Sequence, residues 1–222
     1  MDKKNIFWIL ITVVIAVILL IIVINLVFKS DTVNEGKFRV SDVILTSSAE
    51  LTNKTEKNGV WSIDLSQRNK LSMLVTAATG VEINKVYLSD ITVNKGNVIF
   101  SQLDNESKIT LDSTGKDLDV EYTLDENNQM LLEFVALNEN ILKDWVVPET
   151  TKQIVYDGRM VTTAGLELKD IQFKLKFKLN IVESTGKTNT MKVELLLPNE
   201  ELVTNGADVR RLSLSEFKFK VN

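Results

Sequence analysis

The sequence contains no cysteine and no histidine among its 222 residues. A disulfide framework is therefore excluded, and the fold must depend on a packed apolar core for its stability. Without these two residue types, neither a Ser-His-Asp triad nor a Cys-His pair can be assembled. The usual nitrogen and sulfur ligands of zinc are missing as well. Composition alone thus excludes the commonest nucleophilic enzymes and zinc sites.

Charged residues are absent from residues 6–28, where Thr12 and Asn25 are the only polar side chains. As a helix with a rise of ~1.5 Å per residue, this run would span about 34 Å, which exceeds the roughly 30 Å hydrocarbon core of a bilayer. The run is longer than the apolar part of a cleaved signal peptide and does not end in a small-x-small pair. We therefore predict a retained transmembrane helix over residues 6–28, in contact with the lipid bilayer.

The residues on either side of this helix bear on its orientation. Lys3 and Lys4 precede it, but Lys29, Lys37 and Arg39 follow it, so a count of basic residues does not decide the topology. A short basic head before the first apolar run is typical of a signal-anchor, and large following domains cross largely regardless of charge. We expect a short cytoplasmic tail (residues 1–5), a linker (residues 29–36) and an extracytoplasmic domain (residues 37–222). An exported domain without cysteine favours a bacterial cell envelope.

Apolar and polar residues alternate from residue 37 onward, and turn residues separate the alternating segments. The clearest predicted strand covers residues 171–182, where Phe173, Leu175, Phe177 and Leu179 face one way. Other predicted strands include residues 118–124, 191–197 and 212–221, and one helical turn is predicted over residues 138–146. Short strands at roughly 8–12-residue spacing predict an antiparallel β-sandwich.

A weak internal repeat leaves the number of β-modules open. The segment LSDITV at residues 88–93 resembles LKDIQF at residues 168–173. Two tandem β-modules, with a boundary between residues 125 and 151, would explain the resemblance. Chance would also explain it, because the shared pattern is short and favours strands.

Acidic residues gather in the middle of the chain, with twelve Asp and Glu against three Lys between residues 97 and 150. Asp117, Asp119 and Glu121 alternate, so they project from one face of a predicted strand. Hard oxygen ligands of this kind can hold Ca²⁺, but the spacing of an EF-hand loop is absent. We favour a solvated face and expect no cofactor, with a calcium site as the alternative.

Lysines form the opposite pattern, at Lys174, Lys176, Lys178, Lys218 and Lys220. If the two strands that carry them share a sheet, five ammonium groups face one way and could contact an anionic envelope polymer, lipid headgroups or an acidic protein. A solvated face that resists edge-to-edge aggregation is the simpler interpretation. The net charge of −4 and the expected location argue against nucleic acid as a partner.

These patterns predict a membrane-anchored, extracytoplasmic β-sandwich protein that binds or scaffolds at the cell surface and is not an enzyme. An accessory subunit of a larger envelope machine is one alternative. A carboxylate-dependent surface hydrolase is another, and it would require two Asp or Glu side chains about 5–10 Å apart in a cleft. Fold class by itself does not choose among these functions.

Overall fold

The computed structural model describes residues 36–103, 109–110, 117–147 and 159–221. Both sheets belong to one compact unit, Lys37–Asn222. The predicted tail and transmembrane helix, with all but the last residue of the predicted linker, lie outside the described residues. Within the part of the chain that is described, no helix is long and apolar enough to cross a membrane.

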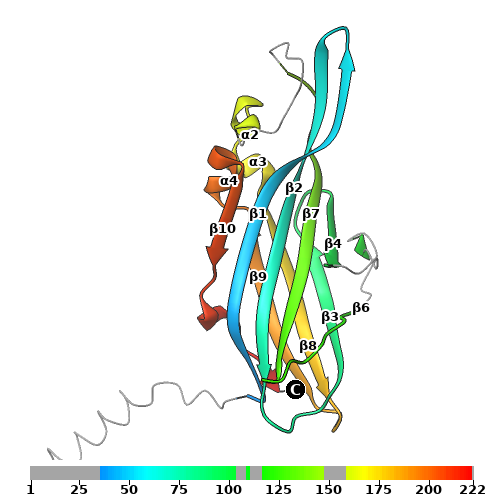
Figure 1. Cartoon of the computed structure of the whole chain (residues 1–222), viewed down its shortest axis with the longest axis vertical. Helices are drawn as coiled ribbons and strands as arrows, with labels where there is room; N and C mark the ends of the chain where they lie inside the picture. The colour runs from blue at the N-terminus through cyan, green and yellow to red at the C-terminus, as the bar shows by residue number, and fades with distance from the viewer. Residues whose placement is uncertain (1–35, 104–108, 111–116, 148–158, 222) are drawn as a thin grey trace, which may run out of the picture. The chain divides into compact units, whose positions relative to one another are not determined.

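Two antiparallel sheets face each other and confirm the predicted β-rich sandwich (Figure 1). Sheet A has the strand order β10-β1-β2-β7-β4-β5, and sheet B has the order β11-β9-β8-β3-β6. The strands of sheet A are β1 (Phe38–Lys57), β2 (Val60–Ala77), β4 (Val98–Gln102), β5 (Ile109–Thr110), β7 (Gln129–Val146) and β10 (Ala207–Arg211). Those of sheet B are β3 (Ile83–Val93), β6 (Leu118–Asp119), β8 (Phe173–Glu183), β9 (Thr188–Leu197) and β11 (Lys220–Val221).

The remaining elements are short helices that connect strands. They are α2 (Met160–Thr163), α3 (Leu168–Ile171), α4 (Glu200–Asn205) and the 3-10 turn η1 (Leu214–Glu216). The first three lie together near one end of the sheets, beside β10 (Figure 1). Both sheets contain strands from before residue 125 and from after residue 151, so the two parts of the chain share one interior.

Apolar side chains of the two sheets meet in the interior. The row predicted to face inward on β8, from Phe173 to Leu179, is at most 2% exposed. The Phe177 ring lies against Phe100 of β4 and Phe134 of β7, with ring centroids 5.4 and 5.9 Å apart. The burial of this row confirms the predicted inward face, and three aromatic rings join sheet B to sheet A.

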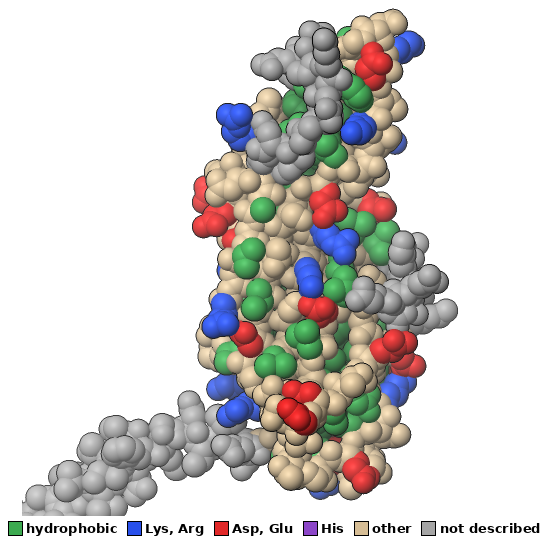
Figure 2. Space-filling view, viewed as in Figure 1, with side chains coloured by type: hydrophobic (Ala, Val, Ile, Leu, Met, Phe, Trp, Pro, Cys, Tyr) green, Lys and Arg blue, Asp and Glu red, His purple; other side chains and the backbone are tan. Residues whose placement is uncertain are grey.

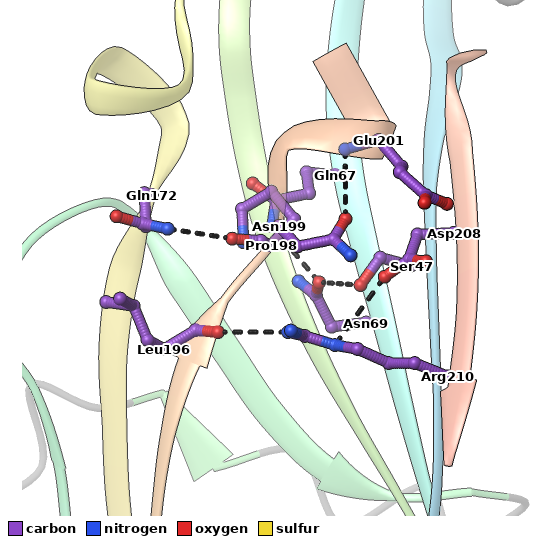
Figure 3. A network of polar contacts seen from close by, with 10 residues as sticks. All are labelled: Ser47, Gln67, Asn69, Gln172, Leu196, Pro198, Asn199, Glu201, Asp208 and Arg210. Atoms are coloured by element: carbon purple, nitrogen blue, oxygen red, sulfur yellow. Dashed lines mark hydrogen bonds and ion pairs between the residues drawn. The ribbon is translucent and has the colours of Figure 1, made fainter. Parts of the chain in front are cut away.

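A layer of polar side chains interrupts this apolar interior. Ser47 of β1 and Gln67 and Asn69 of β2 are at most 1% exposed. The Asn69 Oδ1 atom accepts hydrogen bonds from Ser47 Oγ at 2.7 Å and from Gln67 Nε2 at 3.1 Å (Figure 3). Along β1, Ser47 lies between Leu45 of the main apolar cluster and Ala49 of a smaller cluster. The polar layer therefore separates the two clusters.

The first residue of the domain is fixed to the turn end of the β8–β9 hairpin. Lys37 Nζ lies 2.5 Å from Glu183 Oε2, and the Glu183 side chain is only 3% exposed. Asn189 Nδ2 donates to the other carboxylate oxygen at 2.9 Å. The hydrogen bond from Lys37, followed by that from Asn189, lowers the pKa of Glu183 below its ordinary value because both favour the charged form. The start of β1 is thus tied to sheet B by a charged contact.

The C-terminal segment closes one side of the sandwich by pairing with an outer strand of each sheet. β10 pairs with β1, and β11 pairs with β9. Between them, Phe217 is buried in the main apolar cluster. Arg210 of β10 also connects the two sheets on this side, where its Nη2 atom donates a hydrogen bond to the Leu196 carbonyl of β9 at 3.3 Å (Figure 3). The predicted strand over residues 212–221 is therefore wrong in its extent, since the chain turns through η1 there to change sheets.

The predicted helical turn over residues 138–146 is also wrong, because β7 continues as a strand to Val146. Two shifts in the β2–β7 register add extra residues to β7, and Asn140 and Asp144 adopt positive φ values of 53° and 51° there. Ser66 Oγ and Asp64 Oδ1 of β2 accept hydrogen bonds from the Asn140 and Asp144 amides at 3.1 and 2.7 Å. Extra residues in a bulged strand space its apolar side chains three or four apart, which imitates a helix.

Truncation of Phe177 to alanine should lower the free energy of unfolding by about 3–5 kcal/mol, because the ring joins the two sheets. Denaturant-induced unfolding of the domain, followed by circular dichroism, would measure the loss. The control is Lys176→Ala, one residue away on the exposed side, which should cost less than about 1 kcal/mol. Equal stabilities of the two variants would contradict the inward face assigned to β8.

Candidate functional site

The alternation that buries one face of β8 also determines the outer face of sheet B. Lys174, Lys176 and Lys178 alternate with the buried row, so they point away from the core. β11 belongs to the same sheet as β8. Lys220 lies in β11, and Lys218 comes two residues before it. β8 and β11 therefore do share a sheet, while Lys218 lies in the segment just before β11.

The three lysines of β8 carry counterions from their own sheet. Lys174 Nζ lies 2.8 Å from one carboxylate oxygen of Glu194, and Lys176 Nζ lies 3.0 Å from the other. The hydrogen bond from Lys174, with that from Lys176, lowers the pKa of Glu194 below its ordinary value. Lys178 Nζ lies 2.5 Å from Asp90 Oδ2 of β3. The lysines predicted as a continuous contact stripe along β8 are thus already paired.

A second set of lysines lines a groove that crosses the strands. The groove has a volume of about 790 Å³ and runs over the outer face of sheet B from β3 to the C-terminal segment. Its lysines are Lys178 of β8, Lys192 of β9, Lys218 and Lys220. Among the described residues, none forms an ion pair with Lys192, Lys218 or Lys220. Unpaired positive charge therefore gathers at the β9–β11 side of the sheet.

The cross-strand arrangement of two of these lysines, with like charges opposite each other, has an energetic cost. Lys178 and Lys192 stand directly opposite each other in the β8–β9 ladder. Like charges in directly opposed positions destabilise an antiparallel pair by a few tenths of a kcal/mol up to ~1 kcal/mol. Asp90 neutralises Lys178 and offsets this repulsion, whereas Lys192 has no counterion among the described residues, so the groove is a candidate contact surface.

A row of neutral polar side chains lies beside the lysines. Tyr87, Asn180 and Thr190 are successive partners across β3, β8 and β9. The Thr190 hydroxyl donates to Asn180 Oδ1 at 2.8 Å, and Asn180 Nδ2 donates to Ser89 Oγ at 2.9 Å. Asn180 is only 4% exposed, so these hydrogen bonds hold a fixed floor. The groove thus contains two rows that cross the strands, two residues apart along each strand. The charged row is Lys178, Lys192 and Lys218, and the neutral row is Tyr87, Asn180 and Thr190, with Lys220 at its end.

A β-bulge brings the counterion of Lys178 into the groove. The β3–β8 register shifts between Ser89 and Thr92, and Asp90 within this bulge has a φ of 52°. Few residues other than glycine adopt this left-handed region, although Asp and Asn do so most readily. A bulge re-aims the side chain that it contains. Here it directs the Asp90 carboxylate to Lys178.

The acidic residues proposed as a weak calcium site lie at the opposite edge of sheet B. Asp117, Asp119 and Glu121 are all exposed, which agrees with the predicted alternation. Asp119 Oδ1 is engaged with Lys85 Nζ at 2.6 Å. Within the described ranges, no group of three or more acidic side chains is placed to hold a metal ion together. The hydrogen bond to Asp119, with a smaller electrostatic contribution from Asp117, raises the pKa of Lys85 above its ordinary value.

The outer face of sheet A has a different distribution of charge. Lys and Arg side chains lie among Asp and Glu side chains over this face (Figure 2). Lys70 Nζ lies 2.7 Å from Glu133 Oε1, and Arg211 Nε lies 2.8 Å from Asp42 Oδ1. Mixed charges of this kind are typical of a solvated surface, which leaves the groove on sheet B as the candidate site.

Sequence reasoning missed Lys192, Asp90 and the neutral row. The alternation of residues 191–197 marked Lys192 as outward, but only the β8–β9 register places it beside Lys178. Asp90 carried no signal, because a single residue in a bulge cannot be distinguished from its neighbours by period alone. Asn180 lies on the outward face of β8 by the same alternation, which does not distinguish it from the neighbouring outward residues.

Comparison with protein-family models, with curated proteins and with solved structures finds no match to this chain. The function is therefore inferred from the side chains that line the groove. Among the described residues, the groove offers three ammonium groups without an ion pair, one exchangeable ion pair, the Glu216 carboxylate and a neutral polar row.

The pKa of the Glu194 carboxyl should lie below that of an unpaired glutamate, so it stays ionised to a lower pH. Replacing Lys174 and Lys176 by glutamine removes the hydrogen bonds that favour the charged form and should raise this pKa toward its ordinary value. A ¹³C NMR titration of the glutamate carboxyls would measure the change. Lys85→Gln, which removes a lysine that pairs elsewhere, is the control and should leave Glu194 unchanged. An unaltered pKa in the double variant would refute the pairing.

Proposed function

We propose that this protein is a membrane-anchored binding protein whose β-sandwich contacts an anionic polymer of the cell envelope through the groove on sheet B. The observation that carries the proposal is the set of lysines in this groove. Lys192, Lys218 and Lys220 have no counterion among the described residues, whereas the lysines along β8 have one. Unpaired cations held close together attract a ligand that supplies several anionic groups at once.

Local charge matters more here than net charge. The whole chain has a net charge of −4, so a general attraction to polyanions is not expected. At physiological ionic strength the Debye length is only ~8 Å, which limits the attraction to groups that reach the groove. A contact of this kind is reversible, depends on salt and selects for polymers, because each exposed ion pair contributes only ~0.2–1 kcal/mol.

The apolar run of residues 6–28 supports the location assigned to this activity. A helix of that length would hold the domain at the membrane face, with residues 29–36 as the linker. Tethering raises the effective concentration of the groove near envelope polymers, so weak single contacts are sufficient for retention. A binding or scaffolding role at the cell surface follows from this combination of anchor and groove.

The lysines without counterions should contribute more to binding than the paired lysines. We expect Lys192→Gln with Lys218→Gln to weaken binding of the full chain to purified anionic envelope polymer about ten-fold. Lys174→Gln with Lys176→Gln removes the same charge from the same face but should weaken binding less than about three-fold. Binding should also fall as salt rises. Wild-type protein that does not bind, or binds regardless of salt and of the first pair of substitutions, would contradict the proposed function.

The membrane location has a separate test. Intact cells treated with an external protease should lose residues 37–222 and keep a small membrane-bound fragment, because the domain is expected outside the cytoplasm. Immunoblots against tags at the two ends of the chain would follow both products, and lysed cells serve as the control for access. A domain that resists digestion until lysis would overturn the topology, and a mature N-terminus beyond residue 28 would overturn the anchor.

A further inference from the structure

The ion pair between Asp90 and Lys178 distinguishes one end of the groove. The side chains of Asp90 and Lys178 are 63% and 37% exposed, so both reach solvent and the pair can be exchanged. Lys192, the cross-strand neighbour of Lys178, has no such partner among the described residues. Two carboxylates line the groove, Asp90 and Glu216. Of these, Asp90 is the one that forms an ion pair with a groove lysine, and a bulge with positive φ directs it there. Asp90 therefore occupies the place that an anionic group of a ligand would take on Lys178.

The spacing of the charged row restricts the ligand. Neighbouring strands lie about 4.8 Å apart, so a chain laid across β8, β9 and the C-terminal segment meets one lysine roughly every 5 Å. The register that pairs Lys220 with Thr190 brings Lys218 toward Lys192, and both line the groove. A linear polymer with an anionic group on each short repeat matches this row.

The neutral row restricts the ligand further. Asn180 and Thr190 are buried and bond to each other, so the hydroxyls that reach a ligand in and beside this row are those of Tyr87, Ser89 and Ser215. Hydroxyl groups both donate and accept hydrogen bonds, as sugar hydroxyls do, and Tyr87 adds an aromatic ring that has Lys85 Nζ 5.2 Å from its centroid. Among the described residues that line the groove, none is aliphatic, so the surface does not suit lipid chains. An acidic polypeptide could match the charged row but offers few hydroxyl groups to the neutral row. A polymer with an anionic edge and a hydroxylated, ring-containing body fits both rows.

We infer that the groove binds a linear acidic polysaccharide laid across β8, β9 and the C-terminal segment, and that Asp90 competes with a carboxylate of this ligand for Lys178. The inference rests on the proposed function and specifies its ligand and its internal competitor. In the free protein, Asp90 neutralises Lys178 and lowers the attraction for small anions. A polysaccharide that engages Lys192, Lys218 and Lys220 together can displace Asp90, so the site favours polymers.

Substitution of Asp90 tests the competition. Asp90→Asn keeps a residue that tolerates positive φ, and Asp90→Gly relieves the backbone altogether, while both remove the carboxylate. Each should tighten binding of the full chain, in detergent, to polygalacturonate by about three- to ten-fold. Asp119→Asn is the matched control, because it removes the same charge from an ion pair at the other edge of sheet B, and it should change binding less than two-fold. Calorimetry would give the affinities, and circular dichroism would establish that each variant is folded.

A second polymer separates the ligand classes. Poly-glutamate carries carboxylates without sugar rings, and we expect it to bind at least ten-fold more weakly than polygalacturonate. Equal affinity for the two polymers would overturn the polysaccharide assignment while leaving an anion-binding groove in place. Asp90 variants that behave like Asp119→Asn would overturn the competition. Failure of the wild-type chain to bind either polymer would overturn the proposed function itself.

Discussion

The register of β8 is the constraint on which the other features depend. Its inward row is buried against sheet A, with Phe177 between the rings of Phe100 and Phe134. A shift by one residue would exchange the two faces and place lysines in the core, which would cost far more than any surface contact returns. Because the chain contains no cysteine, no disulfide bond links the two sheets. Apolar burial therefore sets the fold and, through alternation, the outward direction of the lysines.

The groove depends on how the chain closes its sandwich. β10 completes sheet A and β11 adds to sheet B, so the C-terminal segment has to cross from one sheet to the other. This crossing buries Phe217 and leaves Lys218 and Lys220 on the outside, near Lys192. The closure that protects the core is thus also the step that assembles the charged row. A purely stabilising closure would not need lysines at both outward positions.

Counterions decide which of the many surface lysines are available to a ligand. Glu194 satisfies Lys174 and Lys176 at once, and Asp90 satisfies Lys178. Exposed pairs of this kind add little stability, so their main consequence is to restrict unpaired charge to one end of the groove. Inside the protein, the side chains of Ser47, Gln67 and Asn69 form a hydrogen-bonded polar layer between β1 and β2. The hydrogen bonds to Asn69 join β1 to β2, although the buried Gln67 Oε1 atom has no partner among the described residues.

Strong local periodicity determined much of this protein from the sequence alone. The alternating residues of β8 predicted the strand, its inward face and its outward lysines, because burial of one face of a strand imposes a period of two. The same logic failed where tertiary contacts altered the period. Bulges at Asn140 and Asp144, held by side chains of β2, gave β7 a helical spacing. The turn at η1 divided the last predicted strand, since the chain had to change sheets.

The groove itself was decided by tertiary structure. Which lysines are paired depends on the β3–β8 and β8–β9 registers, and at Lys178 these join residues 89 and 14 positions apart. Sequence gives the direction of a side chain relative to its own strand, but it does not give the neighbour across the sheet. Lys192 and Asp90 became visible as site residues only when pairing placed both beside Lys178. Local alternation determines which side chains face outward, and long-range pairing determines which of them meet.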